Sequence, residues 1–183
     1  MTETYLSNVN ILLVEDNRFT QQLVRQVLRV FGARTVRECQ DGTEALEILQ
    51  TWPVDIVIVD WEMSPVNGIE LTRNIRKMKD SYISFLPVIM LTAHSEKSRI
   101  IEARDSGVNE YVVKPLSALS LFKKIQSVIE DPRPFIQNKS YFGPDRRRKD
   151  DAYRGEERRV AEETDQSEPL LEQEEIDALL QSE

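Results

Sequence analysis

Short apolar runs recur along the chain as far as Ile129, and each leads through polar residues into a helical pattern. The runs are rich in Val, Ile and Leu and are bounded by turn residues, which is typical of strands. Parallel strands covered on both faces have this near-continuous apolar character. Strands are therefore expected at residues 11–14, 34–39, 56–60, 88–92 and 111–113.

Between these runs, apolar residues recur at helical spacing, as in Leu23, Val24, Val27 and Leu28, and Gly32 is placed to end that helix in a left-handed conformation. Five strands alternating with five helices predict an α/β fold with a doubly wound five-stranded parallel sheet, because right-handed crossovers place helices on both faces. The strand order 2-1-3-4-5 is taken over from flavodoxin-like proteins of this class.

Polar residues stand at the carboxyl ends of four of these runs, where the working crevice of an open α/β sheet lies. Three carboxylates gathered there would repel one another unless a hard cation sits among them, and such an oxygen-rich site suits Mg²⁺. Asp60 ends the central strand and is the candidate nucleophile for a phosphoryl group, with Lys114 and Thr92 as donors to the transferred oxygens. Each residue alone also fits a helix cap or a loop entry. The converging residues are Glu15, Asp16, Asp60, Thr92 and Lys114.

On these residues, the segment 9–130 resembles the receiver domain of response regulators, the phosphoacceptor half of two-component signalling. The resemblance implies a phosphoacceptor protein that is not a classical enzyme, binds Mg²⁺ and receives its phosphoryl group from a sensor histidine kinase or a phosphotransfer protein. It implies metal ligation by Glu15 and Asp16, phosphorylation of Asp60, and switch or catalytic roles for Thr92, Lys114 and Tyr111.

Three further residues near this site are open to interpretation. The segment 60–63 is similar to chemotaxis-type receivers and places the Glu62 main-chain carbonyl as a metal ligand, whereas the Glu62 side chain departs from the family and bears on the lifetime of the acyl phosphate. Tyr111 is a switch residue or an aromatic that packs at a strand edge. His94, the single histidine, is expected in a surface loop rather than as a phosphoryl carrier.

Length and composition limit the possible domain organisation, ligands and cellular location. The 183 residues have room for one domain and an appendage, and the formal net charge of −8 argues against general attraction to DNA. Cys39 is the single cysteine, excludes an internal disulfide and is expected as a small buried hydrophobe. Neither a signal peptide nor a membrane span is apparent, so a cytoplasmic protein is expected.

An imperfect arginine-rich repeat follows the domain, in residues 131–165 of a largely disordered C-terminal tail. Each copy offers an aromatic ring, a glycine, a carboxylate and adjacent arginines, which suit stacking on a base, bidentate contact with guanine and pairing with phosphate. The repeat resembles the extension of flagellum-associated receivers that bind cyclic di-GMP; a disordered charged linker is the alternative. The candidate ligand residues are Tyr141, Asp145, Arg146, Arg147, Arg148, Tyr153, Arg158 and Arg159.

The last segment, 166–183, has Leu171, Ile176, Leu179 and Leu180 toward one side of a short helix. Such a helix is marginal alone in water and is expected to need a groove. It is similar to the peptide of the flagellar switch protein that phosphorylated chemotaxis receivers bind. It therefore folds back on its own receiver, engages another receiver, or has no dedicated partner.

The leading hypothesis is a single-receiver response regulator that acts by protein contact in chemotaxis or flagellar motor control, with the flagellar switch or another target protein as partner. The alternative is a cyclic di-GMP-binding adaptor in which the receiver is mainly a scaffold. A haloacid-dehalogenase-like phosphatase that uses Asp60 and Glu62 is a weaker third hypothesis.

Overall fold

The computed structural model describes residues 5–138, 141–145, 173, 176 and 177. Within these residues, no helix is both long and apolar enough to cross a membrane. Most of the expected C-terminal helix lies outside the described residues. So do six of the candidate ligand residues of the repeat, namely Arg146, Arg147, Arg148, Tyr153, Arg158 and Arg159.

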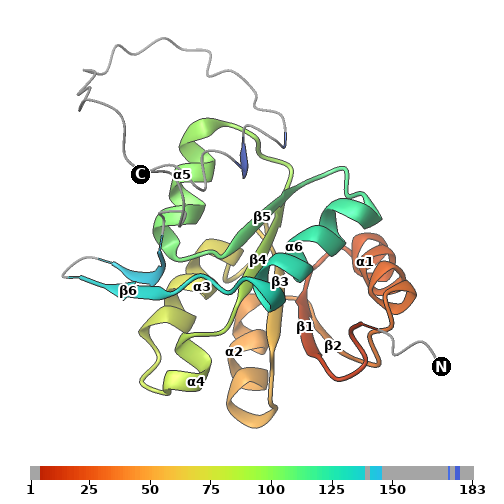
Figure 1. Cartoon of the computed structure of the whole chain (residues 1–183), viewed down its shortest axis with the longest axis horizontal. Coiled ribbons are helices and arrows are strands. Elements are labelled where there is room, and N and C mark those ends of the chain that lie inside the picture. Colours follow the sequence, from red (N-terminus) through yellow and green to blue (C-terminus); the bar gives the residue numbers. More distant parts are fainter. Residues whose placement is uncertain (1–4, 139–140, 146–172, 174–175, 178–183) are drawn as a thin grey trace.

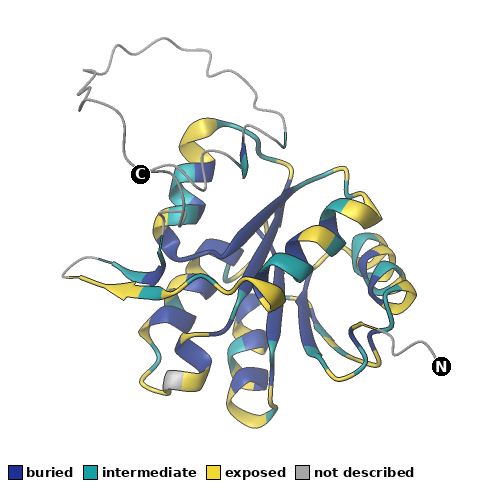
Figure 2. Cartoon of the chain, in the orientation of Figure 1, coloured by how far each residue is buried: buried dark blue, intermediate teal, exposed yellow. Residues whose placement is uncertain are grey.

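A five-stranded parallel sheet forms the centre of the molecule, in the order β2-β1-β3-β4-β5 (Figure 1). The predicted fold class and strand order are thereby confirmed. Every residue of β3 and β4 is buried, as their continuous apolar character indicates (Figure 2). The strands are β1 (Asn10–Val14), β2 (Thr35–Cys39), β3 (Ile56–Asp60), β4 (Val88–Thr92) and β5 (Glu110–Val113).

Helices cover both faces of the sheet, which places the core in two layers. Successive strand side chains alternate between the layers, so that Leu12 packs toward one helix layer and Leu13 toward the other. The first layer contains α2 (Gly42–Thr51), α3 (Gly68–Lys77) and α5 (Lys97–Ser106), and the second contains α1 (Arg18–Val30) and α6 (Ala118–Glu130). A short helix, α4 (Ser81–Ser84), was not predicted.

Local capping fixes where these helices begin and end. The Asn17 side chain accepts hydrogen bonds from the main-chain N–H groups of Phe19 and Thr20, and Asp41 caps α2 in the same way. Gly32 adopts the expected left-handed conformation, with φ of 90°. Cys39 is buried as predicted, and burial raises the pKa of its thiol to about 12.

A two-stranded antiparallel hairpin, β6 (Phe135–Gln137) and β7 (Phe142–Pro144), follows α6. It lies within the segment 131–165, for which no regular structure was predicted. Its Phe135 and Phe142 rings pack against Phe85, with centroid distances of 4.8 and 5.1 Å. The hairpin therefore docks on the loop between α4 and β4.

A buried arginine fastens α3 to the neighbouring loops. The Arg76 guanidinium donates hydrogen bonds to the main-chain oxygens of Ser84, Leu86 and Gly107 and to Asn109 Oδ1, and it lies 5.0 Å from the centroid of the Phe135 ring. Burial lowers its pKa to about 10. This side chain ties together segments that are distant in the sequence.

Candidate phosphorylation and metal site

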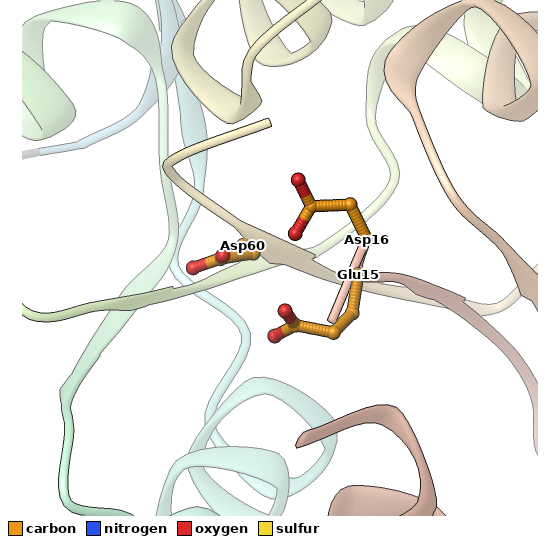
Figure 3. Close-up of side chains that lie close together, drawn as sticks. All are labelled: Glu15, Asp16 and Asp60. Carbon is orange, nitrogen blue, oxygen red and sulfur yellow. The ribbon is translucent and has the colours of Figure 1, made fainter. Parts of the chain in front are cut away.

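Three carboxylates meet at the carboxyl edge of the sheet. Glu15 and Asp16 directly follow β1, and Asp60 is the last residue of the adjacent strand β3, in which Val59 pairs with Val14. One carboxylate oxygen of each lies within 4.8 Å of the others, and the three side chains extend toward the same side (Figure 3). The convergence follows from the parallel register, because neighbouring strands end at the same edge.

Lys114 provides the positive charge of this cluster. It directly follows β5, and its Nζ lies 2.9 Å from Asp60 Oδ1 and 3.2 Å from Glu15 Oε2. Burial alone would lower the pKa of Lys114, but the two carboxylates hold it above its ordinary value. The lysine is therefore a fixed ammonium beside the candidate phosphoacceptor.

The acidic groups remain electrostatically unfavourable despite this lysine. Burial raises the pKa of Glu15, and the nearby Asp60 carboxylate raises it further. Burial also raises the pKa of Asp60, although the hydrogen bond from Lys114 opposes the shift. One lysine does not offset three carboxylates, and the cluster supplies the oxygen donors that a hard divalent cation prefers. The donor set therefore fits Mg²⁺, with Asp16 on the solvent side.

Thr92 and Tyr111 are linked to each other through the loop that follows β4. Thr92 is fully buried, and its Oγ1 accepts a hydrogen bond from the main-chain N–H of His94 at 3.0 Å. Tyr111 is also fully buried, and its hydroxyl donates to the His94 main-chain oxygen at 2.8 Å. Burial raises the pKa of Tyr111, which keeps its hydroxyl protonated as the donor.

The contacts of the His94 ring were not predicted. Its Nε2 lies 3.0 Å from Glu62 Oε1, its Nδ1 lies 3.5 Å from Glu96 Oε2, and its ring meets the Trp61 indole edge-on at 5.7 Å. Glu62 and His94 each stand two residues beyond the end of one of the adjacent strands β3 and β4. That shared spacing is the sequence signal that could have indicated the pair.

Tyr141 and Asp145, two candidate ligand residues of the arginine-rich repeat, lie at the hairpin and are distant in sequence from the carboxylate cluster. The main-chain N–H of Tyr141 donates to Asn138 Oδ1, and the Tyr141 hydroxyl donates to the Pro144 main-chain oxygen at 2.9 Å. The Asp145 main-chain N–H donates to the Pro134 oxygen at 2.6 Å. Both residues therefore take part in closing the hairpin.

Known proteins share the receiver part of this chain. A family model for the response regulator receiver domain matches residues 11–126. The chemotaxis protein CheY-3 of Vibrio cholerae is 39% identical over 123 residues, which cover 67% of this chain and 93% of that protein. The chemotaxis protein CheY of Pseudomonas aeruginosa is 38% identical over 122 residues, which cover 67% of this chain and 97% of that protein.

Solved structures give the same result. The chemotaxis response regulator CheY4 of Vibrio cholerae superposes with a TM-score of 0.60 at 30% identity and covers 66% of this chain and 98% of that one. A response regulator described as putative from Chloroflexus aurantiacus gives a TM-score of 0.61 at 28% identity, with 67% and 99% covered. Fold, carboxylate geometry and sequence similarity agree, and the chain belongs to the response regulator receiver domain family.

Proposed function

We propose that this protein is a single-receiver response regulator that is phosphorylated on Asp60 in the presence of Mg²⁺ and acts by protein contact in chemotaxis or flagellar motor control. The observation that carries the proposal is the position of the Asp60 carboxylate, 2.9 Å from Lys114 Nζ and within the Glu15, Asp16 and Asp60 cluster. The similarity to relatives named as chemotaxis proteins supports the setting.

Each residue has a defined task in phosphoryl transfer. A carboxylate oxygen of Asp60 forms the new bond to phosphorus while the bond between phosphorus and the donor's leaving group breaks. Lys114 stabilises the negative charge on the transferred oxygens, and Thr92 offers its hydroxyl to them. Glu15, Asp16, Asp60 and the Glu62 main-chain carbonyl would hold Mg²⁺, which supplies charge neutralisation at the phosphoryl group.

The readout of phosphorylation is assigned to Thr92 and Tyr111. Both side chains bind the main chain of His94, so a movement of the Thr92 hydroxyl toward a phosphoryl group would alter the loop that also accepts the Tyr111 hydrogen bond. Tyr111 lies in β5, the last strand of the sheet order. The phosphoryl donor would be a sensor histidine kinase or a phosphotransfer protein, and the target a flagellar switch protein or another protein.

Incubation with acetyl phosphate and Mg²⁺ tests the proposal. Mass spectrometry should find a single hydroxylamine-labile phosphoryl adduct, which is lost in Asp60→Asn and in samples treated with EDTA. Asp105→Asn is the matched control, because Asp105 is an exposed carboxylate on α5 and its removal should leave the adduct unchanged. Equal labelling of the Asp60→Asn variant and the wild type would contradict the proposal.

A second input, cyclic di-GMP, is proposed for the arginine-rich repeat on its composition. The candidate residues offer two aromatic rings and five arginines, which match the two guanines and two phosphates of that ligand. Calorimetry should show binding to the wild type and its loss in a double variant, Arg147→Ala with Arg158→Ala. Arg34→Ala, an exposed arginine beside β2, is the control. Unchanged affinity in the double variant would remove this second input.

A further inference from the structure

The outer edge of β5 is bonded by a side chain from the far end of the sequence. The Val113 N–H donates to Gln173 Oε1 at 3.0 Å, and Gln173 Nε2 donates to the Tyr111 main-chain oxygen at 3.3 Å. A residue of a neighbouring parallel strand would make the same pair of bonds, one to residue i and one to residue i+2. The Gln173 carboxamide therefore substitutes for one residue of a sixth strand at the end of the sheet.

An apolar anchor lies one helical turn further along the chain. Ile176 is fully buried and belongs to the core cluster that includes Ile100, Ala103 and Tyr111. Gln173 and Ile176 both have helical backbone, and a spacing of three residues places them on the same side of a helix. The segment thus inserts an aliphatic side chain beside the strand edge that its glutamine caps.

A carboxylate completes the set of contacts. Asp177 Oδ1 lies 2.7 Å from Lys124 Nζ and accepts a hydrogen bond from Gln173 Nε2 at 2.8 Å. Lys124 projects from α6, its side chain is 10% exposed, and it also pairs with Glu110 of β5 at 3.0 Å. A charge-assisted contact to a largely buried lysine depends strongly on position, so it gives the segment a defined register.

We propose that the edge of β5 and the adjoining Lys124 form a docking surface for a helix. Such a helix presents a glutamine, an aliphatic residue and an aspartate at positions i, i+3 and i+4. The resident occupant of this surface is the chain's own segment 173–177. The connection 146–172 spans roughly 90 Å at full extension, which is ample for docking within one molecule. A tethered segment acts at an effective concentration on the order of millimolar, so a partner helix of the same chemistry has to displace it.

Amide hydrogen exchange on the full chain, without a phosphoryl donor, tests the docking. In Gln173→Glu, a carboxylate would replace the Nε2 donor and face the Tyr111 main-chain oxygen and Asp177 Oδ1, and in Ile176→Asp a charge would replace the buried anchor. In both variants the segment should detach, so the Val113 amide should exchange about tenfold faster or more than in the wild type. Gln22→Glu, an exposed glutamine on α1, should not change it. The Ile58 amide, in the centre of the sheet, reports on global folding and should be unaffected. An unchanged Val113 rate in both variants would overturn the proposal.

Competition distinguishes the resident segment from other occupants. A labelled peptide of residues 166–183 should bind the Ile176→Asp chain at least about tenfold more tightly than the wild type, since the tethered segment occupies the wild-type surface. Lys124→Met added to Ile176→Asp should weaken that binding, while Glu110 keeps Ser127 as a partner. Equal binding to the wild type and Ile176→Asp, or binding to neither, would refute the proposal.

Analytical sedimentation tests whether the docked segment comes from a second copy of the chain, because it measures the oligomeric state. The wild type and Ile176→Asp should both be monomeric over the concentration range of the exchange experiment. A wild type that dimerises, together with Val113 protection that rises with concentration, would assign the segment to a neighbouring molecule and overturn docking within one chain. None of these measurements depends on phosphorylation of Asp60, so their failure would leave the proposed function standing.

Discussion

The Asp60 carboxylate lies between opposing influences, because burial disfavours its charge and Lys114 favours it. Glu15 is in the same position, with the Asp60 carboxylate as an added disfavouring charge. In each case the pKa in the folded state is raised above the ordinary value, 3.8 for Asp60 and 4.5 for Glu15. The sign of their pH dependence follows from this direction.

Without metal, the free energy of unfolding should fall as the pH rises through and above these ordinary values, because the folded state holds its protons more tightly than the unfolded state. Mg²⁺ requires both groups ionised, so its affinity should fall as the pH decreases through their raised pKa values. Urea unfolding in EDTA and calorimetric Mg²⁺ titrations across that pH range measure the two slopes. A pH-independent Mg²⁺ affinity would contradict the assignment of these carboxylates as ligands.

Arg76 gives a prediction that concerns stability alone. Arg76→Lys keeps the charge but loses the planar fork of guanidinium N–H donors, which bind the main-chain oxygens of Ser84, Leu86 and Gly107. Leaving buried acceptors without donors should cost about 3 kcal/mol in the free energy of unfolding. Arg73→Lys is the control on the same helix, because that side chain is 50% exposed and should change stability by less than about 0.5 kcal/mol. Equal midpoints in urea for both variants would show that the fork is dispensable.

The β6–β7 hairpin is held against the domain by the close approach of Gly143 to Gly107, as well as by the packing of its Phe135 and Phe142 rings on Phe85. A Cβ atom on Gly143 would lie 3.0 Å from Gly107 Cα and 2.5 Å from Tyr141 Oη. Gly143→Val should therefore push β7 away from the domain and speed exchange of the Asn138 and Asp145 amides, which donate within and beside the hairpin. Exchange in β3 should not change.

Val30→Thr, an exposed substitution at the end of α1, controls for a general effect of altering a β-branched side chain. Wild-type exchange rates in Gly143→Val would show that the hairpin accommodates the added side chain.

The sequence predicts the five strands but neither the hairpin nor the contact of Gln173 with β5. The five strands were predictable because each is a buried apolar run, and the carboxylate cluster followed because parallel strands end at one edge. The hairpin has strands of three residues, and its partner Phe85 lies far away in the sequence. No local pattern reports such a contact. Similarly, Gln173 reaches β5 through its side chain, which periodicity does not reveal.

At the scale of the whole molecule, the positive charge of Lys114 at the carboxyl edge of the sheet should contribute to global stability. Lys114 is the cation that faces Asp60 and Glu15 among the described residues, and it is joined to β5 while they belong to β3 and the end of β1. Its ammonium thus holds together the carboxyl ends of strands on opposite sides of β4. If the proposed function holds, removal of this ammonium should change folding stability, Mg²⁺ binding and phosphorylation through a single electrostatic change.

Lys114→Met should lower the melting temperature in EDTA, because buried carboxylates lose their counter-charge. The stabilisation produced by Mg²⁺ should be larger in this variant than in the wild type, since the metal becomes the main source of positive charge and ligand binding to the folded state raises its stability. Phosphorylation by acetyl phosphate should nevertheless fall sharply, because the lysine no longer neutralises the transferred oxygens. Lys123→Met, an exposed lysine on α6, is the control for all three measurements. If Mg²⁺ stabilised Lys114→Met less than the wild type, the lysine would be supporting metal binding rather than competing with it, and the electrostatic account of the site would be wrong.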